Sequence, residues 1–254
     1  MFLPGLVSVT YRALKPAEII TLAKDAGLRA LEWGSDIHVP EGDNATATAV
    51  GGMTRGASLH VLSYGTYYHA GAYGENYADV FRTYLDTAYA MGTFSLRLWA
   101  GQKNAEDVSA EERAALVKEL RACAKLADSV GRRITFEYHR GTLTNNAASA
   151  ASLIEEIGME NVSLYWQPNQ FVSFEENIEN LNTVLPYVSN VHVFAWKGAE
   201  KFLLAEHEEY WRTYLSILAK NRKRHGLLLE FVPGDKPELL QSEAATLLDW
   251  IKKG

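Results

Sequence analysis

Short apolar runs and longer amphipathic segments alternate along the whole chain. The apolar runs are rich in β-forming residues and read GLVSV, LRALEW, ASLHVLSY, TFSLRLWA, RITFEYH, VSLYWQ, NVHVFAW and LLLEFV. Runs of this length and composition are typical of strands buried in a sheet. We therefore predict eight strands, spread evenly from the beginning of the chain to its end.

Helical periodicity fills most of the intervals between these runs. In residues 75–92, Tyr77, Phe81, Tyr84 and Ala88 fall on one helical face, and Gly92 ends the pattern. Further helices are predicted at 16–27, 109–131, 145–158, 174–186, 206–226 and 237–253, with a weaker pattern at 46–55. Proline in the first turn, serine caps and terminal glycines mark several of their ends.

Repeated strand–helix units predict a parallel sheet covered by helices. Eight such units in 254 residues favour a closed (β/α)8 barrel, an α/β TIM barrel, that forms one domain over residues 1–254. An open doubly wound sheet is the alternative. No change of composition and no Pro/Ser-rich linker suggests a second domain.

Composition and charge exclude several classes of function. The chain is 47% hydrophobic, with a formal net charge of −6, so it lacks the concentrated basic surface that duplex binding requires. Its single cysteine, Cys123, can form no intrachain disulfide. No apolar run approaches the roughly 20 residues that span a bilayer, and the N-terminus lacks the pattern of a secretory signal. We expect a cytoplasmic protein without membrane or nucleic-acid partners, and a homodimer or homotetramer is compatible with the sequence.

Polar side chains stand near the carboxyl ends of seven of the eight apolar runs. They are Glu32, His60, Arg97, Glu137 with His139, Gln167, His192 and Glu230. For any one of them a structural ion pair is the more economical interpretation. The active site of a (β/α)8 barrel, however, lies where the carboxyl ends of its strands meet. We therefore expect these side chains to converge at one rim, with Glu32, His60, Arg97 and His139 contacting substrate.

The last four strands supply a possible ligand set for a metal. Glu137, Gln167, His192 and Glu230 bring two carboxylates, one amide oxygen and one imidazole. Such mixed oxygen and nitrogen donors suit one divalent cation, Mn²⁺, Mg²⁺, Co²⁺ or Zn²⁺.

Tryptophans are concentrated beside the same strand ends. Trp33, Trp99, Trp166 and Trp196 lie at or next to them, and Lys197 follows the last of these four. Aromatic rings around a polar centre suit the apolar faces of a sugar, although packing under the loops explains them equally well. The Gly- and Tyr-rich stretch SYGTYYHAGAYGENY is interpreted as a lid over substrate, or as an irregular packed loop.

The whole chain resembles the xylose-isomerase-like (β/α)8 family. This family contains isomerases and epimerases of sugars and sugar phosphates, together with dehydratases and AP endonuclease family 2 relatives. The resemblance rests on the Glu of ITFEYH, the His of VHVFAW and the Glu of LLLEFV. It implies that Glu137, His192 and Glu230 bind one divalent cation, and that Glu137 and Glu230 are also the catalytic acid/base pair.

The sixth strand departs from the family pattern. Where relatives often carry Asp-x-x-His, this chain has Gln167, Pro168, Asn169 and Gln170. An amide oxygen can bind a divalent cation, so we expect Gln167 to be a ligand and Gln170 to contact a substrate hydroxyl. The resemblance then implies an isomerase or epimerase that moves a proton α to a carbonyl through an enediolate. Lys197 is expected to neutralise a developing oxyanion.

Three other functions remain open. A lyase or dehydratase of a keto-sugar or cyclitol would share the first proton transfer on the same site. A sugar-binding relative without catalysis would explain the amides of the sixth strand. DNA repair is disfavoured by the acidic charge balance.

Overall fold

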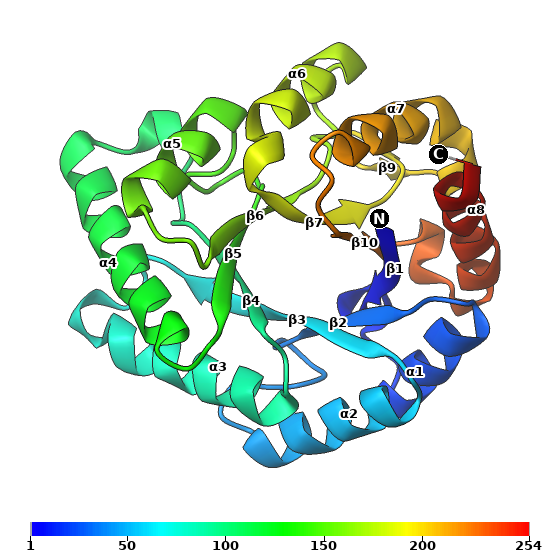
Figure 1. Ribbon diagram of the computed structural model, residues 1–254, viewed down its shortest axis with the longest axis horizontal. Helices are drawn as coiled ribbons and strands as arrows, with labels where there is room; N and C mark the ends of the chain where they lie inside the picture. Colours follow the sequence, from blue (N-terminus) through cyan, green and yellow to red (C-terminus); the bar gives the residue numbers. More distant parts are fainter. Residues whose placement is uncertain (1, 254) are drawn as a thin grey trace.

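The computed structural model describes residues 2–253, and its strands and helices alternate as the sequence predicts (Figure 1). The barrel strands are β1 (Phe2–Val7), β2 (Ala30–Gly34), β3 (His60–His69), β4 (Ser95–Trp99), β5 (Arg133–Glu137), β6 (Val162–Trp166), β7 (Val188–Val193) and β10 (His225–Leu229). A two-stranded hairpin, β8 (Trp196–Lys197) and β9 (Glu200–Lys201), follows β7.

Within residues 2–253, the eight barrel strands form a closed parallel sheet. Their order is β1-β10-β7-β6-β5-β4-β3-β2, and β1 closes the ring by pairing with both β2 and β10. This closure confirms the TIM barrel and excludes the open doubly wound sheet. Every carboxyl strand end therefore opens on the same rim.

A ring of helices surrounds the barrel (Figure 1). It consists of α1 (Pro16–Asp25), α2 (Asn44–Gly56), α3 (Tyr77–Met91), α4 (Ala110–Asp128), α5 (Ala147–Ile157), α6 (Phe174–Val184), α7 (Glu208–Ala219) and α8 (Leu240–Lys253). Side chains at the N-caps Asp43, Ser109, Asn146 and Ser173 accept hydrogen bonds from backbone N–H groups of the first turns of α2, α4, α5 and α6. The weakly patterned segment at 46–55 is thus a full helix. No helix in residues 2–253 has the length and apolarity needed to cross a membrane.

Alternation along the strands sorts apolar side chains into two clusters. Leu6, Leu31 and Trp33 belong to the large cluster between barrel and helices, which we call the outer shell. Leu3, Ala30 and Leu228 belong to a small second cluster. Because successive strand residues face opposite sides of the sheet, the second cluster fills the inside of the barrel. A polar side chain that lies two residues from a member of this cluster on the same strand, such as Glu32 after Ala30, therefore also points inward.

The third strand corrects the prediction for His60. This residue begins β3 instead of ending it, and it is exposed near Arg133 and Arg224 at the amino end of the barrel. The strand runs on to His69 because its pairing with β2 and β4 shifts register along the way. Half of the stretch interpreted as a lid is consequently part of the sheet, and His60 lies at the wrong end of the barrel to contact substrate.

Candidate active site

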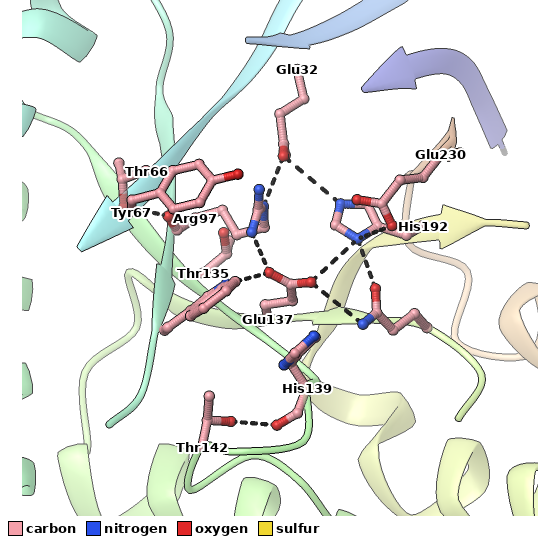
Figure 2. A network of polar contacts seen from close by, with 12 residues as sticks. Glu32, Thr66, Tyr67, Arg97, Thr135, Glu137, His139, Thr142, His192 and Glu230 are labelled. Carbon is pink, nitrogen blue, oxygen red and sulfur yellow. Dashed lines mark hydrogen bonds and ion pairs between the residues drawn. The ribbon is translucent and has the colours of Figure 1, made fainter. Parts of the chain in front are cut away.

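Five ionisable side chains meet inside the carboxyl end of the barrel (Figure 2). They are Glu32 of β2, Arg97 of β4, Glu137 of β5, His192 of β7 and Glu230, which directly follows β10. Each is less than a tenth exposed. We call these five residues the charged layer. Their convergence is what the strand ends predicted, since each stands at an inward position of its strand.

Arg97 ties two of the carboxylates together. Its Nε donates to Glu32 Oε1 at 2.7 Å, and its Nη1 donates to Glu137 Oε2. Burial by itself would lower the pKa of Arg97, but the charges of Glu137 and Glu32 raise it, so the guanidinium stays charged. Burial would likewise raise the pKa of Glu32, yet Arg97 and His192 hold it at about 2. The Arg97–Glu32 pair is therefore ionic at neutral pH.

Gly65 of β3 makes room for this ion pair. A Cβ atom there would lie 2.7 Å from both Arg97 Nη2 and Glu32 Oε1, closer than carbon can approach either atom. The missing side chain on the neighbouring strand thus lets the arginine lie flat inside the barrel.

His192 faces different partners with its two ring nitrogens. Nδ1 lies 2.8 Å from Gln167 Oε1, 3.4 Å from Glu230 Oε2 and 3.9 Å from Glu137 Oε1. Nε2 lies 3.8 Å from Glu32 Oε1 and has no hydrogen-bond partner among the described residues. Nδ1 therefore faces Gln167 and the two carboxylates that line the site, and Nε2 faces the more deeply buried Glu32.

The surroundings shift the pKa values of Glu137 and Glu230 in opposite directions. Burial raises the pKa of both, but Arg97 and His192 outweigh it at Glu137 and lower that pKa. Trp99 Nε1 also donates to Glu137 Oε2 at 2.5 Å. At Glu230, burial and the charge of Glu137 prevail over the attraction of His192, and the pKa is raised. Two facing carboxyl groups with separated pKa values are typical of an acid/base pair.

The four predicted ligands carry donor atoms of the kind that divalent cations bind, and these atoms face the same region of the site. Glu137 Oε1, Gln167 Oε1, His192 Nδ1 and Glu230 Oε2 all face one region, while the other oxygen of Glu137 is held by Arg97 and Trp99. The distances from Nδ1, 2.8 to 3.9 Å, place these donor atoms near one another without closing a coordination shell around one ion. The unpartnered Nε2, directed at Glu32, matches the outer carboxylate that orients a metal-bound histidine.

Glu137, His192 and Glu230 alone are not arranged to bind a metal ion. Among the described residues, no group of three or more His, Cys, Asp and Glu side chains is arranged to hold a metal ion. A cation here needs the amide oxygen of Gln167 and a closer approach of the two carboxylates.

A cavity of about 250 Å³ opens above the charged layer, and we call it the central cavity. Arg97, Glu137, Gln167 and Glu230 form part of its lining, but the buried Glu32 and His192 do not. Its walls also contain the predicted residues Trp99, His139, Gln170 and Trp196. The rings of His139 and Trp99 stack with centroids 5.1 Å apart and planes at 9°.

Several residues of this cavity escaped the sequence interpretation. They include Arg12, Tyr67, Arg140, Asn145, Phe194 and Phe231. Arg12 Nη2 donates to the hydroxyl of Tyr67 at 3.0 Å, which joins the loop after β1 to β3. Tyr67 was missed because β3 extends beyond its apolar run. His69, at the true end of that strand, packs edge-on against Trp99 with centroids 4.3 Å apart.

Three further predicted contacts with substrate lie outside this cavity. Trp33 is fully buried in the outer shell, where its Nε1 donates to Thr54 Oγ1 of α2 at 3.1 Å. Trp166 is also fully buried there, with its ring against Tyr214 of α7. Both point outward because their neighbours, Glu32 and Gln167, point inward. Lys197 is exposed and lines a neighbouring cavity, so it does not face the reacting groups.

The model of the xylose isomerase-like TIM barrel family matches residues 20–253. The chain belongs to this family. No curated protein is significantly similar to it in sequence.

Solved structures of low sequence identity share the fold. The probable 3-DHS dehydratase AsbF of Bacillus anthracis, involved in petrobactin synthesis, superposes with a TM-score of 0.82 at 17% identity, covering 98% of this chain and 99% of its own. D-allulose 3-epimerase from Methylomonas sp. gives 0.71 at 14% identity, covering 99% and 97%. A xylose isomerase-like TIM barrel protein from Mycobacterium smegmatis in complex with magnesium gives 0.70 at 13%, covering 95% and 90%.

Proposed function

We propose that this protein is a divalent-metal-dependent isomerase or epimerase of a sugar or sugar phosphate, acting by proton transfer α to a carbonyl. The observation that carries the proposal is the pair Glu137 and Glu230, two buried carboxyl groups whose oxygens lie 3.9 and 3.4 Å from Nδ1 of His192. A site with two carboxyl groups on either side of the substrate can remove a proton with one and return it with the other.

Each residue of the site has a separate role in the proposed reaction. Glu137 and Glu230 exchange the proton with the carbon next to the carbonyl. Arg97 and Trp99 fix Glu137 through its outer oxygen, which leaves Oε1 directed at the site. Gln167, His192 and the two carboxylates would hold the cation, which when bound polarises the carbonyl oxygen. His139 and Gln170 line the walls where substrate hydroxyls would lie.

A lyase or dehydratase is the second candidate. The fold similarity to a probable dehydratase, AsbF, supports it, and loss of a β-hydroxyl would start from the same proton abstraction. A panel of aldoses, ketoses and keto-cyclitols followed by NMR in D₂O separates the two. Deuterium incorporation with all carbon–oxygen bonds retained supports the isomerase, and loss of water supports the dehydratase. Absence of exchange with every compound would favour a sugar-binding relative.

Metal binding is tested at Gln167. Glu137, Gln167, His192 and Glu230 bring two negative charges to a dication, so replacing the amide by Asp should tighten binding. Isothermal titration with Mn²⁺ and Zn²⁺ on wild type, Gln167→Asp and Gln167→Ala measures this directly. Equal affinity in all three would remove residue 167 from the ligands, and no binding in any would refute metal dependence.

A further inference from the structure

A second, larger cavity adjoins the central one. It measures about 890 Å³ and lies among the β6–α6 loop, the β8–β9 hairpin and α7; we call it the side cavity. Pro168, Asn169, Gln170, Phe194 and Trp196 line both cavities. The two cavities therefore adjoin along these five residues.

Size distinguishes the two cavities. The central cavity, at about 250 Å³, falls below the ~300–1,000 Å³ typical of small-molecule sites, while the side cavity lies within that range. The reacting groups are confined to the smaller one. A substrate that fills only the central cavity would leave the larger adjoining space to water.

Flat aromatic rings line the side cavity. Phe174 of α6 and Tyr210 of α7 stack with centroids 4.3 Å apart and planes at 14°. Phe202 and His207 stack on another part of the wall, with centroids 5.5 Å apart and planes at 26°. Trp196 stands between the two cavities. Because these rings cover one another's faces, a ligand can reach only the parts left exposed, chiefly that of Tyr210, which is 40% exposed and apolar enough to contact the C–H groups of a sugar ring.

The charges of the side cavity restrict what it can hold. Glu175, Glu206 and Glu209 line it together with a single ammonium group, that of Lys197. Burial lowers the pKa of His207, so its imidazole adds no positive charge at neutral pH. Three carboxylates repel a phosphate or carboxylate group but accept hydrogen bonds from neutral hydroxyls.

We propose that the side cavity binds a second, neutral sugar ring, joined through a glycosidic bond to the sugar that reacts in the central cavity. The natural substrate is then a glycoside or disaccharide, a class that rests on the proposed function and sharpens it. The exposed part of Tyr210, which is held in place by its stacking on Phe174, contacts the distal ring, and the carboxylates accept hydrogen bonds from its hydroxyls.

The test compares binding of one ring and two rings. Methyl β-cellobioside and methyl α-maltoside are titrated against methyl β- and α-glucopyranoside by calorimetry and saturation-transfer NMR. At least one disaccharide should bind about tenfold more tightly than its monosaccharide, a difference of about 1.4 kcal/mol. Tyr210→Ala should abolish that advantage and leave monosaccharide binding unchanged. The matched control is Tyr89→Ala, an exposed tyrosine on α3, which should change neither.

Other outcomes overturn the inference. Disaccharides that bind no better than monosaccharides, or not at all, would show that the side cavity is not a sugar subsite. Glucose 6-phosphate binding as tightly as a disaccharide would contradict the charge argument. Binding requires no turnover, so it stays informative if no sugar exchanges deuterium. If monosaccharides do exchange and no disaccharide binds better, the proposed function stands and only this inference fails.

Discussion

The inside of the barrel and the outer shell contrast in what they bury. The outer shell holds side chains such as Phe81, Trp211 and Leu218, which are almost wholly buried and face other apolar groups. The inside combines a small apolar cluster with the charged layer, where Glu32 and Arg97 are buried as ions. Burying apolar area stabilises the fold, whereas burying charges costs free energy that their pairing only partly returns. The contrast indicates that stability comes mainly from the outer shell, and that the charged layer is retained at a cost in stability that the proposed chemistry would explain.

The largest expected effect is on turnover. Glu137→Gln and Glu230→Gln remove a proton-transferring group without changing side-chain volume, so kcat should fall by about 10²–10⁴-fold. The unfolding free energy of Glu230→Gln should change little, because the ionised form of Glu230 is the unfavourable one in its surroundings. Steady-state kinetics and urea unfolding measure the two quantities. Near wild-type kcat in both variants would remove them as the acid/base pair.

The next effect is on stability and comes from breaking the charged layer. Arg97→Met leaves Glu32 and Glu137 buried without their cation, and we expect a loss of about 3–5 kcal/mol in the free energy of unfolding. Adding Glu32→Gln to the Arg97→Met variant should restore part of the lost unfolding free energy, because one unpaired buried charge is then removed. If the losses of unfolding free energy in the two single variants simply add in the double variant, Arg97 and Glu32 do not interact favourably, and the prediction is wrong.

The stability contributed by the charged layer should depend on pH, whereas that contributed by the outer shell should not. Because the pKa of Glu32 is about 2 in the folded protein and 4.5 as its ordinary value, its ionised form contributes stability above pH 4.5 that is lost as pH falls toward 2. The shift corresponds to about 3 kcal/mol. Glu32→Gln should therefore destabilise the protein at pH 7 and converge with wild type near pH 2. Leu218→Ala, in the outer shell, should lose about 2–5 kcal/mol at every pH. A pH-independent loss in Glu32→Gln would contradict the pairing.

The smallest effect is expected at the amino end of the barrel. His60 is exposed there, away from the charged layer, so His60→Ala should change the unfolding free energy by less than about 0.5 kcal/mol. Turnover should equal that of wild type. A clear loss of kcat in this variant would reinstate the residue as a substrate contact.

The sequence predicted the fold class and all five residues of the charged layer. Regular alternation of strands and helices favoured a closed barrel over an open sheet, and the strand ends indicated Glu32, Arg97, Glu137, His192 and Glu230. The sequence could not indicate that Arg97 would bridge two of these carboxylates. That contact depends on the inward position of Arg97 on β4 and on the space that Gly65 leaves on β3.

Two kinds of error have different physical origins. His60 was misplaced because a register shift lengthens β3, and no local pattern reports pairing between strands. Trp33 and Trp166 were misplaced although the signal was present. Each directly neighbours an inward polar residue, so strict alternation already assigned it to the outer shell.

Gly65 carries a consequence for how this site could have arisen. A Cβ atom at that position would lie too close to the ends of the Arg97 and Glu32 side chains, so a larger residue at 65 requires the ion pair to rearrange. Glycine at 65 leaves that space free, whereas arginine at 97 beside a larger residue at 65 would overpack a charged interior. We therefore expect substitutions at positions 65 and 97 to be epistatic, with glycine as the permissive residue.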